Sequence, residues 1–191
     1  MKFFSDLPVD KNIIKALEEI GFLEMTDVQM RAIPTALEGK DIIAQSITGS
    51  GKTAAFGVPI VEKIAHGKGL QAAIIGPTRE LVNQVSAEMQ KFSKHKRLNI
   101  VTVFGGVSIE PQMQRLRAAD IVVGTPGRML DHMQRGTLRL NSVKILVLDE
   151  ADRMLDMGFI DDIRKIISQT PANRQTMLFS ATMPDEIMDI A

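Results

Sequence analysis

Residues 46–53 read Ser-Ile-Thr-Gly-Ser-Gly-Lys-Thr, and this segment constrains the fold of the chain more than any other. It follows a short apolar run, Ile42–Ala44, and precedes a stretch from Ala54 that can form a helix. This order of strand, loop and helix is the context that a phosphate-binding loop requires. Gly49 and Gly51 allow a tight turn, so successive backbone N–H groups can point at phosphate oxygens, and the next helix begins against the anion. The segment therefore predicts an α/β domain with a phosphate site.

The side chains of this loop have distinct expected roles. Lys52 supplies a mobile cation for the β- and γ-phosphates, and the Thr53 hydroxyl is a hard oxygen ligand suited to Mg²⁺. Ser46 stands where Gly or Ala is usual, and its side chain is small enough that we do not expect it to block phosphate. The expected nucleotide-binding residues of the loop are Ser46, Ile47, Thr48, Gly49, Ser50, Gly51, Lys52 and Thr53.

A second segment, nearly all aliphatic from Val143 to Leu148, ends in Asp149-Glu150-Ala151-Asp152. Such a run is typical of a strand covered on both faces. Asp149 would emerge at the carboxyl end of that strand, where open α/β sheets bind ligands, and could hold Mg²⁺ directly or through water. Glu150 could accept a proton from the water that attacks the γ-phosphate. Together with Lys52, these carboxylates predict nucleoside triphosphate hydrolysis; the alternative is a surface lysine and a solvated acidic turn.

The chain resembles the N-terminal RecA-like domain of the DEAD-box RNA helicases, whose name-giving signature is Asp149-Glu150-Ala151-Asp152. Pro77–Leu81 is similar to motif Ia of that family and Gly105-Gly106 to its glycine doublet. Thr125–Arg128 is similar to motif Ib and Ser180–Thr182 to motif III, all in the family order over the 191 residues. The resemblance implies an RNA-dependent ATPase and helicase that uses ATP and Mg²⁺. Its catalytic residues would be Glu150, Asp149 and Lys52, and its magnesium ligands Thr53 and Asp149.

Strand-like runs alternate with helical ones along the chain, which predicts a parallel β-sheet with helices on both faces. By resemblance, this α/β fold is a RecA-like P-loop NTPase domain. We expect residues 1–191 to form a single domain, with a Q-motif region at about residues 2–30 and a RecA-like core at about residues 33–191. The predicted strands are Ile42–Gln45, Gln71–Ile75, Ile100–Phe104, Ile121–Val123, Lys144–Leu148 and Thr176–Phe179.

Gly21–Gln29 resembles the Q motif of the family, which reads adenine. The amide of Gln29 can donate to one edge of a purine and accept from its exocyclic amine, and Phe22 could cover the face of the base. Phe4 stands where the family has an isolated aromatic residue that supports the motif. The prolines that usually flank Thr26 are Met25 and Asp27 here. Thr26 and Gln29 also form a capping box, so the glutamine could simply satisfy a helix N-terminus, and the two roles are compatible.

Two segments that follow strands and open helices carry the expected RNA contacts. Each begins with a threonine suited to a helix N-cap and contains an arginine. As a pair, with a glycine doublet, they would form a row of phosphate-binding positions that reads the RNA backbone and not its sequence; each alone could be only a helix start. By resemblance, the RNA-binding residues are Pro77, Thr78, Arg79, Gly105, Gly106, Thr125, Pro126, Gly127 and Arg128.

The hydroxyls of Ser180 and Thr182 could hydrogen-bond Asp152 and so link the ATP pocket to the RNA face. This coupling role comes from the resemblance; the alternative is an ordinary loop between a strand and a helix, before Pro184.

Composition limits the possible chemistry. The chain has no cysteine, which excludes disulfides and thiolate metal sites. His66, His95 and His132 lie too far apart in sequence to suggest a local metal motif. The net charge of zero argues against a strongly basic nucleic-acid clamp. Any RNA site must therefore be a local patch or use backbone N–H donors.

The first residues do not resemble a signal peptide, and no apolar run approaches the length of a membrane span, so we expect a cytoplasmic protein with no membrane partner. The resemblance also implies a C-terminal RecA-like domain that completes the ATP site with arginine fingers and clamps the RNA. That domain is absent from these 191 residues. We therefore expect the isolated domain to be monomeric, to bind nucleotide and to be nearly inactive alone.

Two alternative functions remain open at this point. One is another P-loop class, such as a nucleotide kinase or a transporter ATPase, although the chain has no Leu-Ser-Gly-Gly-Gln signature and no arginine-rich lid segment. The other is an ATP-dependent RNA clamp that does not separate strands, which would use the same residues as a helicase.

Overall fold

A computed structural model of the chain describes residues 2–47 and 49–190, and it contains one parallel sheet of six strands. Thr48 of the predicted phosphate loop lies outside the described residues. The sheet order is β1-β6-β5-β2-β4-β3. The strands are β1 (Ile42–Gln45), β2 (Ala72–Ile75), β3 (Ile100–Val103), β4 (Ile121–Gly124), β5 (Ile145–Asp149) and β6 (Gln175–Ser180). The predicted strands are therefore confirmed, with ends that differ by at most one residue.

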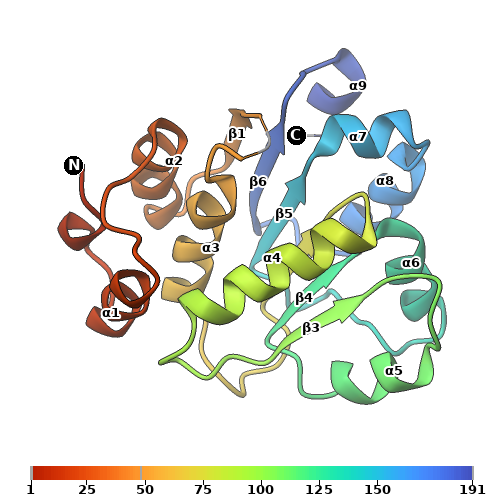
Figure 1. Cartoon of the computed structure of the whole chain (residues 1–191). Helices are drawn as coiled ribbons and strands as arrows, with labels where there is room; N and C mark the ends of the chain where they lie inside the picture. The colour runs from red at the N-terminus through yellow and green to blue at the C-terminus, as the bar shows by residue number, and fades with distance from the viewer. Residues whose placement is uncertain (1, 48, 191) are drawn as a thin grey trace.

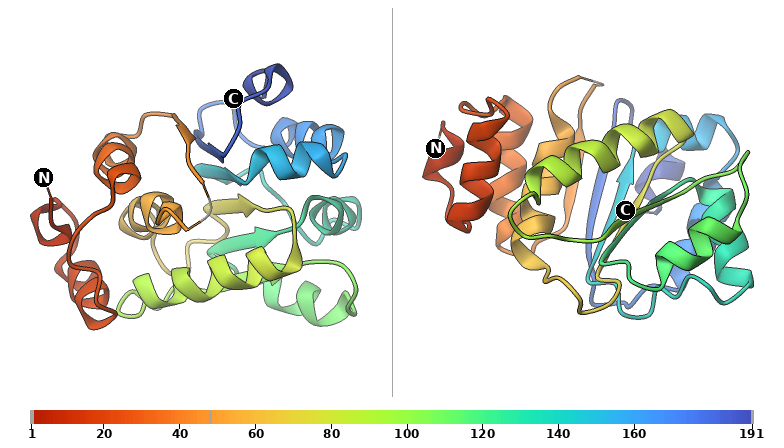
Figure 2. Two further views of the ribbon diagram at one scale, coloured as in Figure 1. Left: turned by 45° about the horizontal axis from the view of Figure 1, so that its top comes forward. Right: turned by 60° about the horizontal axis from the view of Figure 1, so that its bottom comes forward.

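The helices cover both faces of the sheet (Figures 1 and 2). On the way from β1 to the far edge at β3, the chain passes through α3 (Lys52–Lys63) and α4 (Arg79–Phe92), which pack on one face. On the way back through β4 and β5 to β6, the connecting helices pack on the other face. Right-handed crossovers require this change of face when the direction of travel reverses. The returning helices are α5 (Glu110–Leu116), α6 (Pro126–Gln134), α7 (Ala151–Asp156) and α8 (Ile160–Ser168), followed by α9 (Asp185–Met188) after β6.

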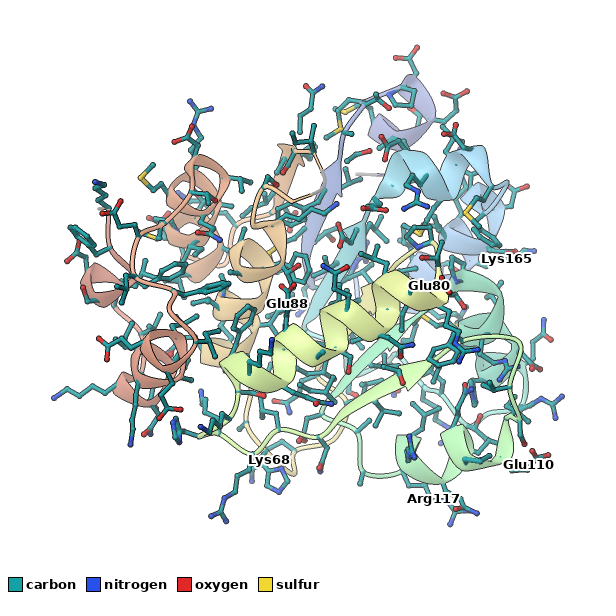
Figure 3. The ribbon with its side chains drawn as sticks, viewed as in Figure 1. Lys68, Glu80, Glu88, Glu110, Arg117 and Lys165 are labelled. Carbon is teal, nitrogen blue, oxygen red and sulfur yellow. The ribbon has the colours of Figure 1, made fainter. Side chains whose placement is uncertain are left out.

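The central strand β5 shows why the aliphatic runs become strands. Ile145 and Val147 belong to the hydrophobic cluster on one face of the sheet, and Leu146 and Leu148 belong to the cluster on the other face. Alternate side chains of a strand point to opposite faces, so a strand buried on both sides must be apolar throughout. Charged side chains instead point outward from the helices, as Glu80, Arg117 and Lys165 do in Figure 3.

The N-terminal segment packs beside α3 and α4. It contains a short 3₁₀ helix (Phe4–Asp6), α1 (Lys11–Glu19) and α2 (Asp27–Leu37). α1 ends in a glycine cap, in which Gly21 has φ +79° and the Phe22 N–H donates to the Leu17 carbonyl at 2.9 Å. The expected Q-motif region and core are joined within α2, which runs continuously through residues 30–33. None of the helices in the described ranges has the length and apolarity that a membrane span requires.

Candidate functional site

The predicted motifs that follow strands lie along one edge of the sheet, because the carboxyl ends of parallel strands meet there. Across this edge, the sheet order arranges the motifs in two adjacent groups. The phosphate loop after β1, Ser180–Thr182 after β6 and Asp149–Asp152 after β5 form the first group. Pro77–Arg79 after β2, Thr125–Arg128 after β4 and Gly105-Gly106 after β3 form the second. The two groups meet where β5 pairs with β2.

The phosphate loop is tied to its neighbours at both ends. The Ser46 N–H donates to the Ser180 carbonyl at 2.8 Å, and the Ser46 and Ser50 hydroxyls are hydrogen-bonded to each other. Gly51, the N-cap of α3, has φ +88°, and a Cβ atom there would lie 2.5 Å from Nε2 of Gln29. A side chain is therefore excluded at position 51 by both backbone conformation and space. Lys52 and Thr53, the first two residues of α3, are buried.

Lys52 brings the two halves of the predicted site together. Its Nζ atom lies 3.0 Å from Oδ1 of Asp149 and 3.3 Å from Oε1 of Glu150. All three side chains are at most 6% exposed. The lysine expected to bind phosphate thus meets the two carboxylates expected to bind Mg²⁺ and water in one buried cluster, although Glu150 lies 98 residues away in sequence.

The Asp149 carboxylate is unusual because it is fully buried and, apart from the ion pair of Oδ1 with Lys52, has no partner among the described residues. Burial raises its pKa from 3.8 to about 6, although the positive charge of Lys52 opposes the rise. Unsatisfied buried carboxylates are rare in folded proteins. The second oxygen, Oδ2, is thus available to a ligand. In the part of the chain that the structure describes, no group of three or more His, Asp or Glu side chains could hold a metal ion on its own.

Glu150 adopts a left-handed backbone conformation, with φ 54° and ψ 51°. Such a conformation is costly for a residue with a side chain and is often found at functional sites. Arg153, one turn later on α7, holds Oε2 of Glu150 at 2.6 Å. Sequence reasoning missed Arg153, although the spacing of three residues within a helix could have indicated the pair.

Gln29 caps α2 and also contacts the phosphate loop. Its Oε1 accepts from the Thr26 N–H at 2.8 Å, and its Nε2 donates to the Gly51 carbonyl at 2.9 Å. The Thr26 hydroxyl donates to the Ser50 carbonyl at 2.8 Å. The helix-capping alternative is thus realised in this structure. Each end of the amide retains one further bonding position, so the adenine contact stays a prediction.

Phe4 packs against Phe22. The two ring centroids lie 5.9 Å apart, and Phe22 also lies 5.8 Å from Phe92 of α4. Phe4 is buried, whereas Phe22 is half-buried. The Phe22 ring is therefore held from behind by two other rings while part of it stays accessible.

Asp152 joins the loops after β5 and β6. Its Oδ2 accepts from the Thr182 N–H at 3.0 Å and from the Thr182 hydroxyl at 3.2 Å, and its own N–H donates to the Ser180 hydroxyl at 3.0 Å. Burial raises the pKa of this carboxyl, but the hydrogen bonds outweigh that effect and lower it overall. The expected contacts of the coupling residues are thus present.

The first RNA motif opens α4. The Thr78 hydroxyl accepts from the Leu81 N–H at 3.3 Å, as an N-cap does, and Pro77 is buried. The exposed Arg79 guanidinium lies 5.0 Å from the centroid of the Phe104 ring, next to the glycine doublet. Motif Ia and the doublet are therefore neighbours, as a shared phosphate track requires.

The second RNA motif opens α6, with Thr125 as N-cap, Pro126 buried and Gly127 exposed. Arg128 is less accessible than we expected, since its side chain is only 13% exposed. It turns toward the glycine doublet and donates to the Val107 carbonyl at 3.0 Å. It therefore holds this loop, which the sequence did not predict.

The glycine-doublet loop exposes backbone donors. Within the described residues, the N–H groups of residues 105–108 make no hydrogen bond, whereas the Phe104 and Val107 carbonyls accept from Gln112 and Arg128. Gly106 has φ +79°, and a Cβ atom at Gly105 or Gly106 would meet no atom within 4 Å, so the loop is open to solvent here. Such a row of free N–H groups is a favourable anion site.

Comparison with known proteins agrees with this geometry. A family model described as DEAD/DEAH box helicase matches residues 26–190. The chain is 51% identical over 193 residues to the DEAD-box ATP-dependent RNA helicase CshA of Geobacillus kaustophilus, covering 100% of this chain and 41% of that protein. It is 53% identical over 192 residues to the ATP-dependent RNA helicase CshA of Listeria monocytogenes, covering 100% of this chain and 37% of that protein. The chain thus spans about two-fifths of the length of these relatives.

A solved structure of a DEAD box protein from Methanococcus jannaschii superposes with a TM-score of 0.97 at 47% identity, covering 100% of this chain and 53% of that one. A hypothetical ATP-dependent RNA helicase from Sulfolobus tokodaii superposes with a TM-score of 0.89 at 43% identity, covering 95% of this chain and 54% of that one. The fold is accordingly the RecA-like one that the sequence predicts. From its motifs, its sheet and these matches, the chain belongs to the DEAD/DEAH box helicase family.

Proposed function

We propose that this chain binds ATP with Mg²⁺ and the sugar-phosphate backbone of RNA, and that it remodels RNA together with a second RecA-like domain. The observation that carries the proposal is the buried cluster of Lys52, Asp149 and Glu150 at the end of β5. It lies beside the loop after β2, where the expected RNA motifs begin. A nucleotide site and an RNA site on neighbouring loops can influence each other.

Magnesium fits the oxygen atoms present. The Thr53 hydroxyl and the Asp149 carboxylate, whose Oδ2 has no partner among the described residues, would hold the ion, and phosphate oxygens and water would supply its other ligands. The bound ion would neutralise phosphate charge. It would also favour the ionised form of Asp149, whose pKa burial raises in its absence.

The chain's own groups would divide the remaining work. Lys52 would bind the β- and γ-phosphates, and the N-terminus of α3, which begins at Lys52, would face them. Glu150 would accept the proton of the attacking water, while Arg153 at 2.6 Å keeps its carboxylate oriented. Gln29 and Phe22 would contact adenine from the edge and the face.

RNA would bind through backbone phosphates. The N-terminus of α4, the N-terminus of α6 and the N–H groups of residues 105–108 all open on the same sheet edge. None of these donors distinguishes one base from another, so binding would not depend on RNA sequence.

Titration with a fluorescent ADP analogue, with and without Mg²⁺, tests the nucleotide site in the 191-residue chain. Lys52→Ala should weaken binding about 10- to 100-fold through loss of a charge-assisted phosphate contact. Lys91→Ala, an exposed lysine of α4, serves as the matched control and should bind normally. Equal affinity of Lys52→Ala and the parent would overturn the proposed site.

A further inference from the structure

Gln112 occupies an unexpected position behind the glycine-doublet loop. It lies on α5, is 7% exposed, and its Nε2 donates to the Phe104 carbonyl at 3.1 Å, with a weaker contact of 3.5 Å to the Ser108 carbonyl. These two carbonyls bracket the loop, so one buried amide holds both of its ends. Because Nε2 faces carbonyls, Oε1 must face the opposite way, toward α6.

His132 of α6 completes this arrangement from the other side. It is fully buried, and its Nε2 lies 3.1 Å from Oε1 of Gln112, while its Nδ1 lies 2.9 Å from the Thr137 hydroxyl. Oε1 can only accept, so Nε2 of His132 carries a proton. Burial lowers the pKa of this imidazole, and the positive charge of Arg128 lowers it further. The lowered pKa favours the neutral ring with its proton on Nε2, facing Gln112, while the Thr137 hydroxyl lies beside Nδ1 and donates to the His132 carbonyl at 3.1 Å.

We infer that Gln112 and His132 are positioning residues for RNA binding: His132 orients the Gln112 amide, and Gln112 turns the carbonyls of the glycine-doublet loop inward so that its N–H groups face the RNA phosphates. The inference rests on the proposed RNA site. Neither residue touches RNA in this arrangement. Gln112 donates to two carbonyls of residues 104–108 and Arg128 to a third, that of Val107, so three carbonyls of this loop are bound by side chains.

The direction of the loop dipoles explains why this matters. A carbonyl that faced outward would repel a phosphate, whereas an outward N–H attracts it. Gly106 at φ +79° permits the required turn but does not by itself select it, because glycine adopts many conformations. Gln112 and His132 therefore fix in advance the conformation that RNA needs, which reduces the ordering cost of binding.

The chain offers a matched control for a test. Gln71 is equally buried, at 3% exposure, and its Nε2 also donates to two loop carbonyls, those of Ala65 at 2.8 Å and Gly69 at 3.1 Å. It precedes β2 and so lies at the opposite end of the strands from the RNA motifs. Gln112→Met and Gln71→Met both remove one buried amide of similar length. His132→Leu and His132→Gln form a second pair, since only glutamine can restore a donor to Gln112.

Binding of a single-stranded oligouridylate to the 191-residue chain should weaken about tenfold in Gln112→Met and His132→Leu, the equivalent of about one net hydrogen bond. His132→Gln should recover most of this loss. Gln71→Met should bind RNA normally even if it melts earlier, and all variants should bind the fluorescent ADP analogue like the parent. Heteronuclear NOE values of amides 105–108, measured without RNA, should fall in Gln112→Met and stay high in Gln71→Met.

The outcomes separate this inference from the function on which it rests. If RNA leaves amides 105–108 of the parent unshifted in NMR spectra, the proposed RNA site is wrong and the inference falls with it. If the parent amides shift on RNA addition but Gln112→Met binds RNA equally well with an equally ordered loop, only the positioning role is overturned. Equal losses in Gln112→Met and Gln71→Met would also overturn it, since they would reflect general destabilisation.

Discussion

The Lys52 ammonium lies 3.0 Å from the Asp149 carboxylate, so the cation of the phosphate loop neutralises the acid at the end of β5. Glu150 shares the same ammonium at 3.3 Å. A bound triphosphate would compete with both carboxylates for this lysine, and a metal ion would compete with the lysine for Asp149. The nucleotide-free site is thus internally compensated, but at an energetic cost that depends on pH.

Asp149→Asn should stabilise the nucleotide-free chain at neutral pH. The pKa of Asp149 is raised from 3.8 to about 6, so the folded state binds this proton more tightly than the unfolded state does. Protonation of Asp149 therefore adds to the free energy of unfolding. This contribution is fully present below about pH 4 and is lost as pH rises through about pH 6. The asparagine variant avoids this loss and should gain up to about 3 kcal/mol at pH 7.

Urea unfolding at pH 4 and pH 7 measures this effect. The parent and Asp149→Asn should differ at pH 7 and converge at pH 4, whereas Asp156→Asn, at the exposed end of α7, should track the parent at both. A variant that is less stable than the parent at pH 7 would show that ion pairing with Lys52 outweighs burial.

Gln29→Ala should affect both stability and base preference. It removes the cap of α2 and the contact with the Gly51 carbonyl, which should cost about 1–3 kcal/mol because buried partners are left unsatisfied. If Gln29 and Phe22 read adenine, the parent should favour ADP over GDP and the variant should lose most of that preference. Equal affinities of the parent for ADP and GDP would leave Gln29 with the capping role alone.

Much of the fold and site follows from local patterns in the sequence. The aliphatic run before Asp149 predicts a buried central strand, and the glycines before Lys52 predict a phosphate loop, because burial and turn geometry depend on neighbouring residues. The partners of polar side chains do not follow in this way. Nothing local indicates that Gln112 faces His132, or that Arg128 turns inward to Val107 instead of outward to solvent. These contacts join different elements, and only the packed structure selects among the available acceptors.

Glu150→Gln, tested in a polypeptide with both RecA-like domains, should bind ATP nearly as well as the parent while hydrolysis falls about 10²- to 10⁴-fold, the usual contribution of a general base. Glutamine keeps the size of the side chain but accepts no proton from water. Steady-state turnover and equilibrium ATP binding should be measured together. Unchanged turnover would mean that Glu150 orients Lys52 and Arg153 and does not act as the base.

The 191-residue chain alone should hydrolyse ATP barely, with little or no stimulation by RNA, and should unwind nothing. An arginine supplied from elsewhere contributes about 10³–10⁵ in rate in related P-loop enzymes. The relatives that the chain matches are more than twice as long, which leaves room in them for a second domain.

RNA binding by the chain should be weak and readily lost with salt, because few phosphates would be neutralised. Addition of a C-terminal RecA-like domain should restore RNA-dependent turnover, and the gain should disappear when the arginines of that domain that face the triphosphate are replaced. Robust RNA-stimulated hydrolysis by residues 1–191 without that domain would mean that the catalytic site is complete within the chain or is completed by a second copy. A dilution series would separate these two explanations. Only self-association makes the specific activity fall as the protein is diluted.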